Sequence, residues 1–168
     1  MTHIAEPLPE ATRPRFFAGI ELLTDLLYLA REASHLDYES IAITCVVNEA
    51  GMRPLLVGPR APLEFVNLAA PPDELRGSIS RALIAGRTGL PRETVRRKVK
   101  KMIAAGSMMQ AVDGGVRPAQ WLARPELQNL ANDIFAAVRR YDKRLRLLGC
   151  EGVHREVAGK PSPKKTRR

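Results

Sequence analysis

The chain has 168 residues with 27 basic and 18 acidic side chains, so its formal charge is +9 and its pI is about 10.1. A hydrophobic fraction of 45% permits a buried core, and an aromatic fraction of only 5% means that Leu, Ile, Val, Ala and Met must fill that core. No apolar run approaches the roughly 20 residues of a membrane-spanning helix, and residues 1–14 lack the apolar segment of a signal peptide. We therefore expect a soluble cytoplasmic protein.

The positive charge favours a polyanionic partner through phosphate neutralisation and counterion release. Charge alone does not choose among DNA, RNA and an anionic membrane surface. Cys45 lies in an apolar run and is expected to be a buried, reduced thiol, because Cys45 and Cys150 do not have the spacing of a disulfide framework or a metal site. The three histidines are scattered and no nucleophile elbow or phosphate-binding glycine loop is present, so we expect no enzyme, metal or cofactor.

Residues 1–13 carry prolines and charges with little periodicity, and a disordered N-terminus is expected. Residues 14–77 form the next predicted region, which contains two helices and a linker. Pro14 suits the start of a helix over about 15–33, because its missing N–H costs nothing in a first turn. This helix is apolar on more than one side and needs more than one packing partner. Its main stripe is Phe16, Ile20, Leu23, Leu27 and Ala30.

A second helix is predicted over about 38–52, with Asp37 as its N-cap. Gly51 and Pro54 are expected to end it. The following stretch, residues 54–77, contains five prolines and is expected to be a connection. The apolar face of the helix is formed by Ile41, Val46, Val47 and Ala50.

The functional interpretation depends on residues 78–120. Ser80 can cap a short helix, and Gly89 supplies the left-handed backbone that a tight turn between two helices commonly needs. Pro91 begins a second helix that extends to about Ala104. The pattern therefore predicts a helix, a tight turn and a second helix.

The second of these helices is strongly amphipathic. Val95, Val99 and Met102 share one face and are expected to meet a core. Between residues 91 and 106, six basic side chains stand against one acid, which gives a local charge of +5. Such a helix fits the major groove, where its first side chains reach base edges and later ones reach phosphates. The basic residues are Arg92, Arg96, Arg97, Lys98, Lys100 and Lys101.

A β-hairpin is predicted directly after this helix. Residues 108–112 are expected to form a short strand, and Gly114-Gly115 belongs to a turn that tolerates positive φ. Val116 and Arg117 are expected to begin the return strand, which Pro118 limits. The hairpin would be a wing, from which Arg117 reaches the DNA backbone or the minor groove.

The run from Ile79 to about Gln120 resembles the winged helix-turn-helix of bacterial transcription regulators, and it covers about a quarter of the chain. The matching motifs are Gly89-Leu90-Pro91, Arg92-Glu93-Thr94-Val95-Arg96-Arg97, Ala105-Gly106 and the Gly114-Gly115 hairpin. The expected fold is therefore mainly α with a small β-hairpin wing, a winged helix-turn-helix with flanking N- and C-terminal helices.

The resemblance implies duplex DNA as the partner and a DNA-binding site on the second helix. Thr94 would contact a phosphate, and Arg92, Glu93, Arg96 and Arg97 would be groove residues. The basic face adds Lys100 and Lys101, and the wing adds Arg117.

Residues 121–150 are predicted to contain a C-terminal helix over about 125–148, which Gly149 ends. Its apolar repeat alternates steps of four and three residues, as in a coiled-coil seam. This seam either packs within its own subunit or pairs two copies, together with the N-terminal helix. The repeat consists of Leu127, Ala131, Ile134, Val138, Tyr141, Leu145 and Leu148. Residues 151–168 form a basic tail that is expected to be disordered.

The leading hypothesis is a homodimeric, nucleoid-associated transcription regulator. A second is a protein-interaction module that uses the winged helix as a docking surface. A third is a nonspecific nucleic-acid binder driven by the net charge and the tail, which would show a steep salt dependence and no sequence preference. The operator, any effector, and the choice between activation and repression stay open.

Overall fold

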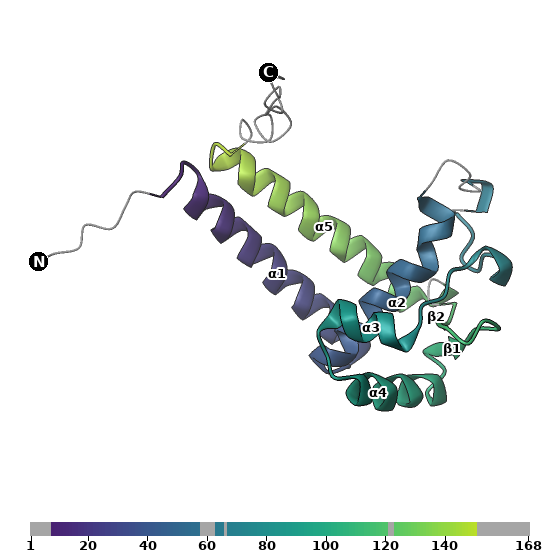
Figure 1. Ribbon diagram of the computed structural model, residues 1–168. Helices are drawn as coiled ribbons and strands as arrows, with labels where there is room; N and C mark the ends of the chain where they lie inside the picture. The colour runs from purple at the N-terminus through teal and green to yellow at the C-terminus, as the bar shows by residue number, and fades with distance from the viewer. Residues whose placement is uncertain (1–7, 58–62, 66, 121–122, 151–168) are drawn as a thin grey trace, which may run out of the picture. The chain divides into compact units, whose positions relative to one another are not determined.

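The computed structural model describes residues 8–57, 63–65, 67–120 and 123–150. The chain is mainly helical with one antiparallel β-hairpin, which confirms the coarse fold prediction (Figure 1). The helices and strands are α1 (Thr12–Ser34), α2 (Tyr38–Leu56), α3 (Arg81–Thr88), α4 (Arg92–Ala104), β1 (Met108–Gln110), β2 (Val116–Pro118) and α5 (Pro125–Leu147). Two short 3-10 helices, η1 (Leu63–Phe65) and η2 (Asp73–Leu75), lie between α2 and α3.

Two compact units make up the chain. The first contains residues 1–26 and 133–168, and the second contains residues 27–132. α1 begins at Thr12, so the predicted disordered segment 1–13 wrongly includes the first two residues of this helix. Residues 1–7 and the predicted basic tail lie outside the described residues.

The hydrophobic core of the second unit joins α2, α3, α4 and the hairpin. Each of these elements contributes at least one fully buried aliphatic side chain. The core therefore extends beyond the predicted 78–120 segment, because α2 supplies one wall of it. Its largest fully buried side chains are Ile43, Val47, Ile84, Val95, Val99 and Val116.

The start of α2 follows the sequence prediction, and its end does not. Asp37 is the N-cap, and its carboxylate accepts a hydrogen bond of 2.9 Å from the Ser40 N–H. The helix continues through Gly51 and Pro54 to Leu56, so its predicted end near residue 52 is wrong. Pro54 lacks one backbone donor, but the helix is held by its packing against the core.

Gly51 has a packing role instead of ending the helix. A Cβ at this position would lie 2.7 Å from Pro118 Cδ, so only glycine lets α2 approach β2 so closely. The carbonyl of Gly51 also accepts a hydrogen bond of 3.0 Å from the Gly77 N–H.

Cys45 is exposed, which corrects the expectation of a buried thiol. The apolar run around it is helical, and Cys45 lies two residues from both Ile43 and Val47, away from their buried side.

The predicted short helix, tight turn and second helix are present. Ser80 caps α3 by accepting a hydrogen bond of 3.2 Å from the Leu83 N–H. Gly89 has φ of 70°, and its N–H donates to the Ala85 carbonyl at 2.9 Å. α4 then starts directly after Pro91. A left-handed residue thus ends α3 and redirects the chain into α4.

The hairpin pairs Met108 with Pro118 and Gln110 with Val116. β1 ends two residues earlier than expected, and Val112 at the tip is fully exposed. Ile79 forms an additional antiparallel bridge with Val116, with N···O distances of 2.9 and 2.8 Å. The sequence analysis did not predict this bridge, which attaches the start of α3 to the hairpin.

In the first unit, α1 and α5 lie side by side and antiparallel, as two ion pairs show (Figure 1). Arg140 and Asp25 approach to 2.7 Å, and Arg144 and Glu21 to 2.9 Å. Among the described residues of this unit, only Ala18, Ala137 and Cys150 are buried. The large apolar side chains of the pair that stay exposed include Phe16, Phe17, Ile20, Leu23, Ile134, Phe135, Val138 and Leu147.

Candidate nucleic-acid interface

The orientation of α4 is set by its apolar side. Val95 and Val99 are fully buried and Met102 is nearly so. Full burial of one such side chain contributes about 1.5–3 kcal/mol, so rotation of the helix about its axis would be costly. The opposite side of α4 therefore faces solvent.

Three basic side chains occupy this outer side, and a fourth, Arg92, is exposed in the first turn, three residues before the buried Val95. None of them forms an ion pair with another described residue, and all four are exposed. Since no ion pair neutralises these charges, this surface of α4 carries an unbalanced positive potential. They are Arg92, Arg97, Lys100 and Lys101.

Glu93 and Arg96 form a bidentate ion pair on the surface of α4. Arg96 Nε donates to Glu93 Oε2 at 2.8 Å, and Arg96 Nη2 donates to Glu93 Oε1 at 2.6 Å. These hydrogen bonds lower the pKa of Glu93. The pair is solvent-exposed and contributes little to stability, but it holds the Arg96 guanidinium in place. Thr94, the predicted phosphate contact, is half-buried on the flank of the helix.

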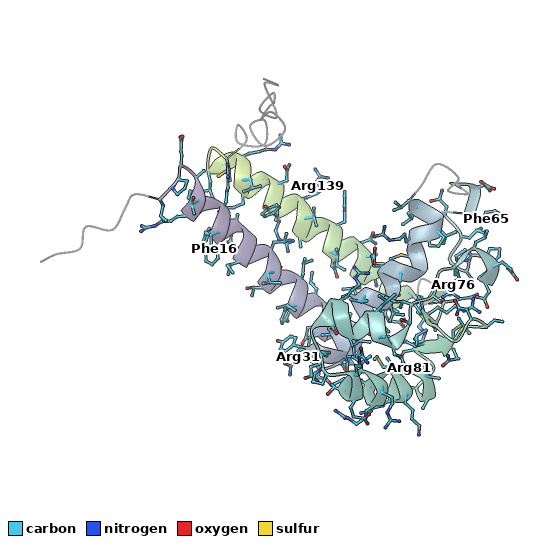
Figure 2. The ribbon with its side chains drawn as sticks, viewed as in Figure 1. Phe16, Arg31, Phe65, Arg76, Arg81 and Arg139 are labelled. Atoms are coloured by element: carbon cyan, nitrogen blue, oxygen red, sulfur yellow. The ribbon has the colours of Figure 1, made fainter. Side chains whose placement is uncertain are left out.

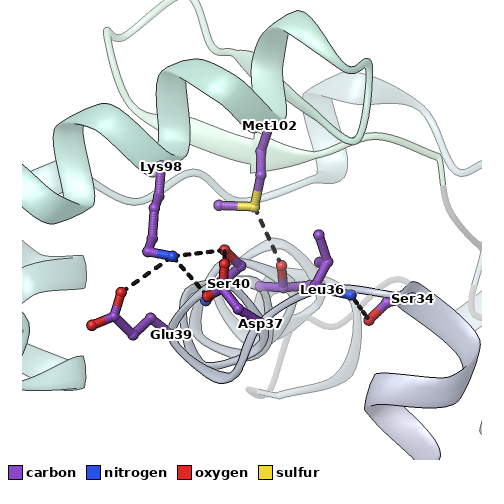
Figure 3. Close-up of polar contacts among 8 residues, drawn as sticks. Ser34, Leu36, Asp37, Glu39, Ser40, Lys98 and Met102 are labelled. Carbon is purple, nitrogen blue, oxygen red and sulfur yellow. Dashed lines mark hydrogen bonds and ion pairs between the residues drawn. The ribbon is translucent and has the colours of Figure 1, made fainter.

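Lys98 differs from the other basic residues of α4 because it points inward. Its Nζ lies 2.7 Å from Asp37 Oδ1, 3.2 Å from Glu39 Oε2 and 3.3 Å from Ser40 Oγ (Figure 3). The hydrogen bonds from Lys98 and from the Ser40 N–H lower the pKa of Asp37 to about 2. Lys98 thus connects α4 to the first turn of α2, and it does not belong to the outer face.

The predicted wing residue Arg117 is engaged within the protein. Its Nη2 lies 2.9 Å from Asp73 Oδ2, its Nη1 donates to the Asp73 carbonyl at 3.0 Å, and only 14% of its side chain is exposed. Arg76 pairs with the same carboxylate at 2.9 Å and donates to the Pro118 and Ala119 carbonyls. Both arginines attach the hairpin to η2, so neither is available on the outer face.

Arg81 lies beside the basic residues of α4, and the sequence analysis did not single it out. It lies in the first turn of α3 (Figure 2). Its Nη2 donates to Gln110 Oε1 at 2.7 Å. Together with Arg96, Lys100 and Ile103 it lines a hollow of about 340 Å³ on the flank of α4. The signal in the sequence was a base directly after the Ser80 cap, but the partner on β1 is 29 residues away.

The basic residues of α5 are partly engaged in the first unit. Arg140 and Arg144 pair with acids of α1, and Arg144 also lies over the Phe17 ring at 5.9 Å.

In the described part of the chain, no three His, Cys, Asp or Glu side chains come together as metal ligands. The described helices include none with the length and apolarity to cross a bilayer.

Comparisons with protein-family models, with curated proteins and with solved structures find no match to this chain. The functional argument therefore depends on the geometry of α4 and its surroundings.

Proposed function

We propose that this protein is a DNA-binding transcription regulator and that α4 is its recognition helix. In this proposal α2, the Ile79 bridge, α3, α4 and the hairpin constitute a winged helix-turn-helix. One observation carries it: α4 presents four exposed basic side chains that form no ion pair with a described residue, three of them on the face opposite the side that is fixed in the core. A helix of this kind fits the major groove of B-DNA.

The individual side chains divide by their position along α4. Arg92 and Glu93 lie in the first turn, where side chains of a recognition helix meet base edges. Arg97, Lys100 and Lys101 follow on the outer face and suit phosphates or guanine edges. Arg117 is left out of the proposed site because its largely buried guanidinium is already bonded to Asp73.

The proposed regulator acts as a homodimer. In the first unit a pair of helices leaves most of its apolar side chains exposed, and a second copy of this pair would cover them as in a four-helix bundle. Two recognition helices would then meet half-sites about 34 Å apart on one duplex. The seam residues on α5 are Leu127, Ile134, Val138, Tyr141 and Leu145, with α1 as the other half.

The test of DNA binding is fluorescence anisotropy with duplexes selected from a random pool. Arg97→Ala and Lys101→Ala are each expected to weaken binding by about 1–3 kcal/mol if they contact a base, and by less if they contact a phosphate. Arg53→Ala is the matched control, since Arg53 is an exposed arginine of α2 paired with Glu49. Unfolding curves verify that the variants stay folded. Unchanged affinity in both α4 variants would contradict the site, and equal affinity for all duplexes would instead indicate a nonspecific binder.

A protein-docking function is the second candidate. It is favoured by Leu83 on α3 and Val112 at the hairpin tip, which are both exposed apolar side chains of the second unit. Under this alternative an acidic partner would bind in the presence of nuclease, and Leu83→Glu would weaken that binding while no duplex is bound.

A further inference from the structure

We propose that Arg81, Arg96 and Lys100 form a cradle for one backbone phosphate of duplex DNA. This inference depends on the proposed function and names an additional contact, made by α3 outside the recognition helix. The observation behind it is the hollow of about 340 Å³ lined by these three bases and Ile103. No acidic side chain is among its lining residues in the described part of the chain.

Arg81 is held in position before any ligand arrives. It is half-buried, and its Nη2 donates to Gln110 Oε1 at 2.7 Å. The Gln110 amide nitrogen in turn donates to the Gly114 carbonyl, so the hairpin orients the glutamine. Because glutamine is neutral, Arg81 keeps its full charge. A guanidinium has five donors, and most of them stay available for a planar, bidentate contact with phosphate.

The charge of the cradle suits a phosphodiester. Three bases line the hollow, and one of them, Arg96, is paired with Glu93 outside it. The local sum is three positive charges minus one, or +2. A phosphodiester carries one negative charge and has unesterified oxygens that accept from several donors. Ile103 supplies an apolar wall, next to which electrostatic attraction is less screened than in open water.

The position of the cradle favours a contact with the sugar-phosphate backbone of DNA over a contact with the bases. Arg81 belongs to α3, while the centre of the outer face lies on α4 around Arg97. When α4 enters the major groove, residues on its flank meet the sugar-phosphate strand that borders the groove. Lys100 lies between the two regions and completes the cradle from the α4 side.

The test is a double-mutant cycle with Arg81→Ala and Lys100→Ala on a selected 24-bp duplex, measured between about 50 and 200 mM salt. Each phosphate neutralised contributes about 0.9 to the slope of log K against log salt. If the two bases share one phosphate, their effects on affinity are non-additive. The double variant then loses at most about 0.9 of slope in total, because Arg96 stays beside the same phosphate. Arg87→Ala is the control, since Arg87 is an exposed α3 arginine that pairs with Glu49 and does not line the hollow.

The outcomes separate the cradle from the proposed function. A slope loss of about 1.8 in the double variant would mean two independent phosphates and would overturn the cradle. Full affinity and slope in Arg81→Ala, while Arg97→Ala weakens binding, would also overturn it and leave the proposed function standing. A wild-type protein that binds no duplex would contradict both the cradle and the proposed DNA-binding function. Arg81→Gln repeats the test without shortening the side chain, should Arg81→Ala unfold.

Discussion

Lys98 shows how one side chain in a run of similar residues takes a different role. It is almost fully buried on α4, and its ammonium contacts two carboxylates and a hydroxyl from the first turn of α2. Asp37 is therefore both the cap of α2 and the counter-charge of Lys98. The acidic partners lie about 60 residues earlier in the chain. The sequence therefore groups Lys98 with the other basic residues of the helix and does not identify this contact.

Replacement of Asp37 by Asn tests this contact through pH. Asn keeps a cap acceptor for the Ser40 N–H but loses the negative charge. The pKa of Asp37 falls from 3.8 to about 2 on folding. Its contribution to stability is therefore complete above pH 3.8 and is lost as pH falls through 2. We expect Asp37→Asn to cost about 1 kcal/mol at pH 7, because solvent screens this mostly exposed carboxylate.

Urea unfolding at a series of pH values measures the effect. The stability difference between wild type and Asp37→Asn is expected to shrink toward zero between pH 4 and pH 2. Glu74→Gln serves as the control, because Glu74 is exposed and forms no ion pair with a described residue. A difference that stays constant over this pH range would show that the Asp37 charge does not contribute to folding.

At the scale of the elements, local chemistry in the sequence predicted helix starts well. Asp37, Ser80 and Pro91 each begin the helix that the sequence assigns to them. These signals act within three or four residues and so are visible in one dimension. The end of α2 could not be predicted in this way, because Gly51 is selected by contact with Pro118 on a strand 67 residues later.

The close approach of α2 and β2 predicts how a substitution of Gly51 changes the stability of the fold. Gly51→Ala is expected to destabilise the fold by about 1–3 kcal/mol, because the new Cβ would overlap Pro118. Gly86→Ala on α3 is the matched control: no atom lies within 4 Å of its added Cβ. There, alanine should stabilise by about 0.5–1 kcal/mol through its better helix propensity. Denaturant unfolding of both variants tests this, and a Gly51→Ala variant more stable than wild type would contradict the packing.

The candidate site was predicted in part for the same reason. The amphipathic period of α4 identifies Arg97, Lys100 and Lys101 as outward residues, and the structure places them on the outer side. Arg117 and Arg81 depend on contacts with Asp73 and Gln110, which are distant in sequence. A periodicity indicates which side chains face outward, but only the tertiary structure shows which of those charges are already neutralised.

For the whole molecule, the first unit raises a question of folding. Two long helices that bury only Ala18 and Ala137 cannot form a core of their own. The apolar surplus predicted for the N-terminal helix is present, since Phe16, Ile20 and Leu23 are exposed. The proposed dimer answers this by providing a second helix pair.

Val138→Glu tests the dimer. Val138 is exposed on α5, so the substitution is tolerated within one copy but places a charge in the proposed interface. Light scattering after size exclusion is expected to show twice 18.6 kDa for the wild type and 18.6 kDa for the variant. Leu83→Glu, on an exposed apolar position of the second unit, is expected to leave the dimer intact. A monomeric wild type, or a variant that stays dimeric, would contradict the proposal.

The aliphatic character of the second unit's core has a spectroscopic consequence. Its buried cluster consists of Ile, Val, Ala and Met side chains, with no aromatic ring among the described members. Near-ultraviolet dichroism will therefore report little of its packing, and ring-current shifts of its methyl resonances will be small. The isoleucine and valine methyl groups nevertheless pack against the buried side of α4. Methyl-selective NMR can therefore observe whether the packing of α4 on the core changes when a ligand binds its opposite face.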